Sequence, residues 1–88
     1  MAEVIRVGHS DPGHGWLAVK FSDLKMLGIE ADITDFSYMK GKTAYLEEDK
    51  DASTYIRAMK AKGIDVVVRQ GPQRDRSPIR SFKRYEVV

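Results

Sequence analysis

Basic side chains gather near the C-terminus of the chain. Residues 69 to 84 carry six cations and one acid, Asp75, which gives this segment a charge of +5 in a chain whose net charge is +2. A guanidinium group can donate two parallel hydrogen bonds to an oxyanion. The segment therefore predicts contact with phosphates or with an acidic protein surface, and the alternative is a solvated strand edge whose charges resist aggregation. The predicted binding residues are Arg69, Arg74, Arg76, Arg80, Lys83 and Arg84.

A second group with possible chemistry is His9, Asp11 and His14, in the pattern HxDxxH. Imidazole and carboxylate groups bind zinc and other divalent ions. A structural zinc site uses about four protein ligands, and only three are visible here. The segment Asp11-Pro12-Gly13 is also typical of a turn, in which the Asp11 carboxylate accepts hydrogen bonds from nearby backbone N–H groups. We assign no metal ligand from this pattern.

Acidic residues form a third group, at Glu47, Glu48, Asp49 and Asp51, interrupted by Lys50. Their oxygens could bind a divalent cation, although the spacing of an EF-hand loop is absent. Acids at the start of a helix also complement the helix dipole. A third interpretation is contact with a basic patch, either on another protein or among the arginines of this chain.

Aromatic residues lie close to both ends of the chain. Phe82 and Tyr85 stand among the C-terminal cations, where they could stack on bases or bury against the sheet. Trp16, the single tryptophan, is expected in the core. The Gly-His-Gly segment before it lacks the longer glycine patterns of nucleotide-binding loops. No catalytic arrangement can be derived, so we expect a protein that is not an enzyme and that carries no cofactor.

Length and composition limit the class of protein. The 88 residues, with 42% hydrophobic and 32% charged side chains, predict one soluble domain over residues 1–88, with a basic C-terminal arm at 69–84. So small a core gives marginal stability without a partner or a second subunit, so a homodimer is left open. The absence of cysteine suits a reducing compartment. No signal-peptide core and no apolar run of bilayer length is present, so we expect a cytoplasmic protein that does not bind membranes.

Hydrophobic periodicity predicts the elements that must position these groups. Ser22 and Asp51 are the expected N-caps of the two helices, Gly28 and Gly63 end them, and Phe21 and Met26 have the spacing of a hydrophobic staple. The predicted fold class is α+β, a small single domain with a mostly antiparallel sheet in the order β-β-α-β-β-α-β and two helices on one face. Strands are expected at 3–7, 16–20, 36–39, 43–47 and 64–68, helices at 22–28 and 51–63, and an extra C-terminal strand within 81–88.

Three details of this prediction can be checked against a structure. A hairpin with Lys40-Gly41 as its loop would pair Tyr38 with Thr43 and Phe36 with Tyr45. Residues 69–78 are expected to form a loop, because glycine and proline occur among polar residues. The main helix should bury one stripe, made of Ala52, Tyr55, Ile56 and Met59.

Three segments together resemble a known group of proteins. They are GHGWLAV at 13–19, GKTAYLEEDKDAS at 41–53 and RSPIRSF at 76–82. Over nearly the whole chain, the sequence is similar to small uncharacterised proteins of bacteriophages, plasmids and proteobacterial genomes. The resemblance implies a bacterial or phage setting and brings no assigned activity or site residue.

We therefore expect a non-catalytic binding protein of phage or mobile-element type, whose basic C-terminal segment engages an anionic partner. Nucleic acid is slightly favoured as that partner. The first alternative is a protein–protein inhibitor or adaptor that acts on an acidic host protein, such as a defence component, through both the acidic and the basic segments. The second alternative is a metal-dependent enzyme that uses His9, Asp11 and His14.

Overall fold

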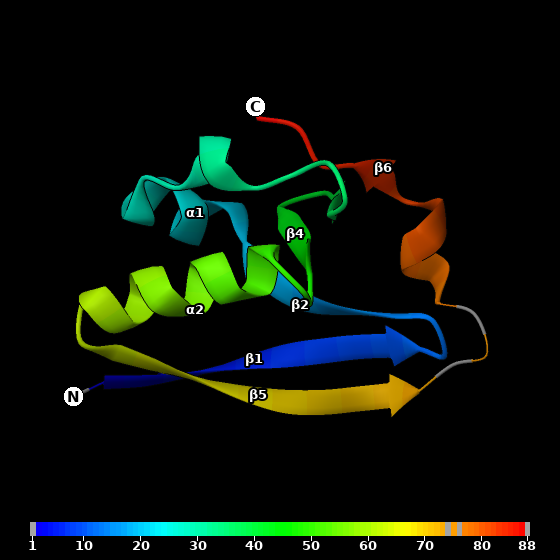
Figure 1. Cartoon of the computed structure of the whole chain (residues 1–88), viewed down its shortest axis with the longest axis horizontal. Helices are drawn as coiled ribbons and strands as arrows, with labels where there is room; N and C mark the ends of the chain where they lie inside the picture. Colours follow the sequence, from blue (N-terminus) through cyan, green and yellow to red (C-terminus); the bar gives the residue numbers. More distant parts are fainter. Residues whose placement is uncertain (1, 74, 76, 88) are drawn as a thin grey trace.

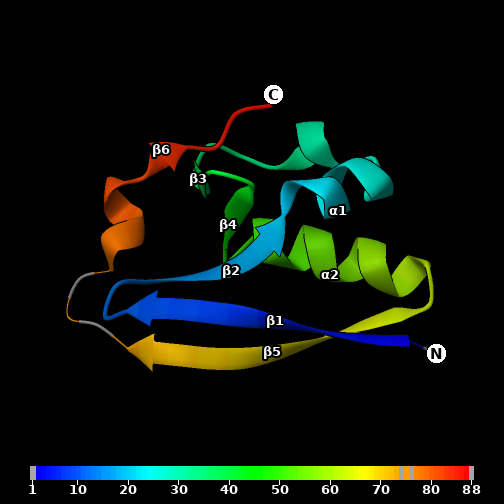
Figure 2. The same ribbon diagram turned by 180° about the vertical axis from the view of Figure 1, so that it is seen from behind.

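The structure is a computed structural model that describes residues 2–73, 75 and 77–87. Its sheet has six strands in the spatial order β5-β1-β2-β4-β3-β6, and α1 and α2 lie on one side of it (Figures 1 and 2). The predicted α+β layout is confirmed. In chain order the elements are β1 (Ala2–Asp11), β2 (His14–Lys20), α1 (Phe21–Leu27), η1 (Glu30–Asp32), β3 (Tyr38–Lys40), β4 (Thr43–Glu47), α2 (Asp51–Ala61), β5 (Ile64–Gln73), η2 (Pro78–Ser81) and β6 (Lys83–Arg84).

The sheet is antiparallel except where β5 runs parallel to β1. Because α2 connects β4 to β5 across the sheet, β5 arrives beside β1 in the same direction. In a strand, successive side chains point to opposite faces. One face of the sheet therefore meets the helices, and the other, which we call the helix-free face, lies away from them (Figure 1).

The core forms between the sheet and the helices. Leu17 and Val19 of β2 lie beside Leu46 and Ala44 of β4, and all four are buried. The expected stripe of α2 packs on them: Ala52, Tyr55 and Met59 are buried, and Ile56 is half-buried. The stripe prediction is confirmed, because a period of 3.6 residues keeps these side chains on one side of the helix.

A polar network closes one side of this core. The Tyr55 hydroxyl donates to the Asp23 carboxylate at 2.9 Å and accepts from the Arg6 Nε at 3.2 Å. Arg6 also forms an ion pair with Asp23 at 2.9 Å. Burial, together with the Asp23 carboxylate, raises the pKa of Tyr55 to about 12. The network therefore joins β1, α1 and α2.

Both helices end as predicted but begin differently. Gly28 and Gly63 follow them with positive φ angles of 69° and 77°, a conformation that glycine adopts without steric cost. The predicted Ser22 cap is wrong, because α1 starts directly after β2 at Phe21, whose N–H donates to the Lys42 carbonyl. The staple is also wrong, since Met26 is exposed and Phe21 stacks on Tyr85 with ring centroids 5.7 Å apart.

Asp51 is not the N-cap of α2 but its first residue, and it is fully buried. Its Oδ2 accepts hydrogen bonds from the Thr34 backbone N–H at 3.1 Å, the Thr34 hydroxyl at 2.7 Å and the Ser37 hydroxyl at 2.5 Å. These donors lie between η1 and β3. The carboxylate thus holds this connection against the start of α2, instead of capping the helix.

The predicted hairpin is present with a different register. Tyr38 pairs with Tyr45 and Lys40 with Thr43, which leaves Gly41-Lys42 as the loop. Gly41 has a φ of 61°. This left-handed conformation is unfavourable for residues with a side chain, so glycine suits the first loop position better than lysine does. Phe36 consequently lies outside β3.

The prediction of a loop over 69–78 is wrong for the first five residues. Residues 69 to 73 continue β5, because they remain hydrogen-bonded beside β1. Farther along the chain, the Ser77 N–H donates to Asp11 at the end of β1, η2 follows, and β6 pairs with β3. Because β5 and β6 are the two edge strands, this C-terminal segment spans the width of the sheet. The expected final strand is confirmed in a short form.

Candidate binding groove

Aromatic side chains gather on the helix-free face. The strand registers place Tyr38, Tyr45 and Trp16 there, because their neighbours Met39, Ala44 and Leu17 point toward the helices. These rings make contacts among themselves and with the rings of His9, His14 and Phe82. Measured between ring centroids, Trp16 lies 6.2 Å from Tyr38, in an edge-on arrangement, and 5.9 Å from His14. Tyr45 lies 5.8 Å from His9 and 5.2 Å from Phe82.

Cations lie over three of these rings. The Arg80 guanidinium is 5.7 Å from the Trp16 ring, and the Arg84 guanidinium is 5.3 Å from the Tyr38 ring. The Lys40 ammonium is 4.8 Å from the Phe82 ring. A cation within about 6 Å of a ring face is attracted by the negative charge of that face. Aromatic and basic groups from distant parts of the sequence thus form one surface.

A groove of about 600 Å³ opens on this surface. Its volume falls in the range of about 300–1,000 Å³ that is typical of ligand sites. Phe36 contributes a large ring and is 64% exposed, whereas Trp16, which lines the same groove, is only 4% exposed. The groove is lined by His14, Trp16, Phe36, Tyr38, Glu47, Asp49, Lys50, Arg80 and Arg84. It therefore combines aromatic walls with both signs of charge, and we call it the aromatic groove.

Asp11 holds Arg80 in place at this groove. Arg80 donates from Nε to the Asp11 Oδ2 at 2.6 Å and from Nη2 to Oδ1 at 2.8 Å. The same carboxylate accepts from the backbone N–H groups of Ser77 at 2.9 Å, and of Gly13 and His14 at 3.2 Å each. The hydrogen bonds from Arg80, followed by the one from Ser77, lower the pKa of Asp11 strongly. The pair fixes the Arg80 guanidinium over Trp16, because two parallel bonds restrict its orientation.

Arg84 is held by different contacts. Its Nη1 donates to the Asp35 carbonyl at 3.0 Å, and β6 sets Arg84 opposite Tyr38. Because a carbonyl carries no full charge, the Arg84 cation is not neutralised by this bond. Arg84 lines the groove together with the exposed Phe36 ring, and its guanidinium bonds the carbonyl of Asp35, the residue before Phe36.

The structure separates the six predicted binding residues. Arg69 lies on β5 and Lys83 and Arg84 on β6, at opposite edges of the sheet. Lys83 forms an ion pair with Glu86 at 2.5 Å. Only Arg80 and Arg84 line the aromatic groove, and Arg74 and Arg76 lie outside the described residues. The predicted basic segment is therefore not a continuous patch over the residues that the structure describes.

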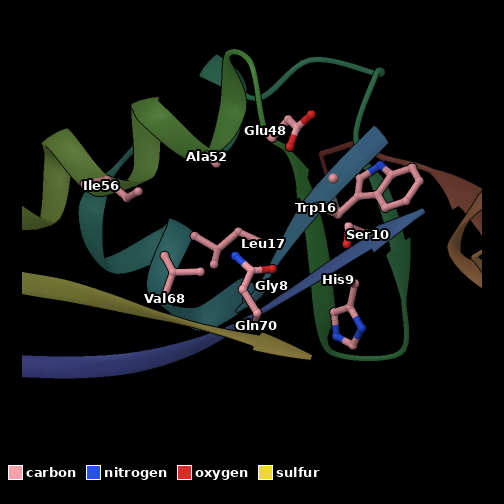
Figure 3. Close-up of a pocket in the computed structure, with 11 residues that line it drawn as sticks. Gly8, His9, Ser10, Trp16, Leu17, Glu48, Ala52, Ile56, Val68 and Gln70 are labelled. Atoms are coloured by element: carbon pink, nitrogen blue, oxygen red, sulfur yellow. The ribbon is translucent and has the colours of Figure 1, made fainter. Parts of the chain in front are cut away.

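The acidic cluster is also divided by the fold. Asp51 is buried in the loop contact described above, whereas Glu47 and Asp49 line the aromatic groove. Glu48 lies over Gly15 near a second, smaller hollow of about 150 Å³ between the sheet and α2. Figure 3 shows the Gln70 amide pointing toward Gly8 and Leu17 in this hollow, which leaves room for little more than a few water molecules.

Sequence reasoning missed Phe36, Tyr38 and His14 as groove residues. The sequence predicts a hairpin for Phe36 and Tyr38 and offers His14 as a metal ligand or a turn residue, and no local signal connects the three to the arginines. One cue was available for Phe36, because it follows Thr-Asp, a pair that favours turns over strands. An aromatic residue there has no strand partner to bury it.

Asp11 is the residue of the HxDxxH pattern for which the structure gives a clear role. Both of its oxygens accept hydrogen bonds from protein donors, including the Arg80 cation. Over residues 2–73, 75 and 77–87, no group of three or more acidic or histidine side chains is placed to hold a metal ion. Within the same residues, no helix is long and apolar enough to cross a membrane.

Comparisons with known proteins add no further assignment. No family model, no curated protein and no solved structure matches this chain. The resemblance to small phage and plasmid proteins stays a prediction, and the function must be argued from the groove itself.

Proposed function

We propose that this chain is a non-catalytic binding protein that holds a segment of a partner protein in the aromatic groove. The observation that carries the proposal is that the exposed Phe36 ring and Arg84 line the same groove, which also contains Glu47 and Asp49. Aromatic residues and arginine are enriched at the centres of protein interfaces, where they contribute most of the binding energy. This supports the adaptor or inhibitor hypothesis over the nucleic-acid hypothesis.

Charge balance is the reason for this preference. Arg80 is paired with Asp11, so the remaining charges that line the groove are Arg84 and Lys50 against Glu47 and Asp49. A phosphate backbone would meet two carboxylates there, and like charges brought together cost free energy. A polypeptide carries both signs of charge and can satisfy both kinds of group.

Nucleic acid is the second candidate, and one observation favours it. A groove lined by an exposed ring and a guanidinium can also bind single-stranded nucleic acid, with a base stacked on the ring and a phosphate on the cation. In that case affinity must fall with salt, by a log–log slope of about 0.7 per neutralised phosphate. A partner protein held largely by apolar contacts would show a weaker salt dependence.

The test uses the immobilised protein with a nuclease-treated bacterial lysate and with single-stranded oligonucleotides. We expect a protein to be retained after nuclease treatment and to be lost with the Phe36→Ala, Arg84→Ala double variant. The affinity of the purified partner should fall by about 30-fold or more, because central interface residues contribute about 2 kcal/mol or more. Met26→Ala is the matched control, since Met26 is 55% exposed on α1 and does not line the groove.

Two outcomes would contradict the proposal. Equal retention by the wild type and the double variant would show that the groove is not the binding site. Retention that disappears with nuclease, together with steeply salt-dependent oligonucleotide binding, would favour the second candidate.

A further inference from the structure

Strand β5 forms one edge of the sheet and is open along its outer side. Figures 1 and 2 show it at the margin, with no other element drawn beyond it. Residues 67 to 70 are all exposed, and the Val67 and Val68 side chains have exposed fractions of 42% and 41%. Such an edge presents unpaired backbone N–H and C=O groups, which are ready to pair with another strand.

The regular part of β5 has a well-defined midpoint. Residues 64 to 70 pair continuously with residues 2 to 8 of β1, and the register shifts after Gly8. Val67 is the central residue of this seven-residue segment. A two-fold axis through Val67 would therefore use the whole regular segment of both copies.

Charge complementarity supports that axis. Antiparallel pairing about Val67 places Asp65 opposite Arg69 of the second copy, and the symmetry produces this pair twice. Directly opposite charges on adjacent strands stabilise pairing. Neither Asp65 nor Arg69 forms an ion pair with another described residue of its own chain, so both are available for this contact.

Apolar complementarity points to the same register. Asp65, Val67 and Arg69 share the helix-free face, because strand side chains alternate. Ile5, which is 59% exposed, is the register partner of Val67 on β1. Across the axis, two Val67 and two Ile5 side chains would form one apolar stripe between the two charge pairs, which removes exposed apolar surface from water.

We propose that β5 pairs with β5 of a second copy of this chain, antiparallel about Val67, to form one continuous twelve-stranded sheet from the two six-stranded sheets. A C2 interface of this kind uses the same surface patch on both subunits. The aromatic groove lies toward the other sheet edge and remains accessible in the dimer. The dimer is therefore independent of the proposed function and can fail or hold without it.

Single cysteines test the register, because the native chain contains none. Oxidation of Val67→Cys should give a covalent dimer, since directly opposed Cα atoms are about 4.5–5.5 Å apart and a disulfide spans about 4.4–6.8 Å. Val68→Cys is the matched control, with the same residue type and exposure. Its two copies would be about 8 Å apart in this register, which is too far for a disulfide. Equal crosslinking of both variants, or faster crosslinking of Val68→Cys, would overturn the proposal.

Charge reversal tests the Asp65–Arg69 contact. Sedimentation is measured at protein concentrations from about 10 µM to about 1 mM, which is the range in which a weak dimer dissociates. Asp65→Arg alone and Arg69→Asp alone should each raise the dimer dissociation constant by about tenfold or more, because each variant creates two like-charge pairs. A mixture of the two variants should restore dimers, since every pair across the axis is then attractive. A wild-type protein that stays monomeric throughout, or a mixture no better than either variant, would refute the contact.

Discussion

Asp11 shows how one carboxylate can organise a distant segment. It is the last residue of β1, yet it accepts hydrogen bonds from Ser77 and Arg80, which lie 66 and 69 residues later in the chain. Its side chain is 1% exposed. A carboxylate that is buried in this way stays charged only because donors surround it. Its role is to fix η2 and Arg80 over the aromatic residues of the sheet.

The lowered pKa of Asp11 predicts acid sensitivity. A depressed pKa contributes stability that is fully present well above the unfolded-state pKa, near 3.9. This contribution is lost progressively as pH falls from about 5 toward the folded-state pKa. We expect Asp11→Asn to be less stable than the wild type at neutral pH and to show a flatter pH dependence between pH 3 and 7 in urea unfolding experiments. Asp32→Asn, an exposed change in η1, is the control. Parallel pH curves for wild type and Asp11→Asn would contradict the prediction.

Helix α2 illustrates how burial is distributed within one element. Met59 is 2% exposed on the stripe that faces the sheet, whereas Ile56 on the same stripe is half-buried. Ile56 lies beside the small hollow near Gly8 and Gln70, which leaves part of its surface open. Met59 and Ile56 are therefore expected to contribute differently to the free energy of unfolding, although both lie on the same stripe.

We expect Met59→Ala to lower the free energy of unfolding by about 2–5 kcal/mol, the usual cost of truncating a buried methionine or leucine. Ile56→Ala should cost clearly less, because part of its side chain already contacts water. Urea unfolding of both variants measures the difference. Equal losses would mean that the hollow beside Ile56 is closed in solution.

At the scale of the whole molecule, the C-terminal segment brings Tyr85 into the core beside α1 and the connection before β3. Tyr85 follows β6 and is buried against Phe21 of α1, and its hydroxyl donates to the Glu30 carbonyl at 2.7 Å. Its backbone N–H donates to the Ser37 carbonyl at 2.9 Å. Burial raises the pKa of the Tyr85 hydroxyl, with a further contribution from Glu30. Tyr85 thus completes the core, although the segment at 69–84 just before it is predicted to be a binding arm.

Tyr85→Ala should therefore destabilise the whole domain in a single transition. We expect a loss of about 3–5 kcal/mol, as for other buried aromatic residues. Val87→Ala, at a site that is 56% exposed, should change stability by less than about 0.5 kcal/mol. Thermal and urea unfolding measure both variants. An unchanged midpoint for Tyr85→Ala would show that the C-terminal segment is not docked in solution.

Several features of the fold could be read from the sequence because they depend on neighbours in the chain. The stripe of α2 follows from helical periodicity, and Gly28, Gly41 and Gly63 have the positive φ angles expected where a helix or a hairpin turns. The order of the elements follows from the same local preferences. By contrast, the hairpin register was misplaced, because the position of Gly41 in the loop depends on how both strands pair.

The aromatic groove was decided by the tertiary structure. Phe36 and Arg84 line the same groove although 48 positions separate them in the chain. Asp11 meets Arg80 only because the C-terminal segment crosses the sheet from β5 to β6. Backbone preferences and periodicity, which act over a few residues, were enough to predict the order of the elements but not the full length of β5. Which charges stay exposed, which pair and which line a common surface depends on strand order, and strand order is set by packing between residues far apart in the chain.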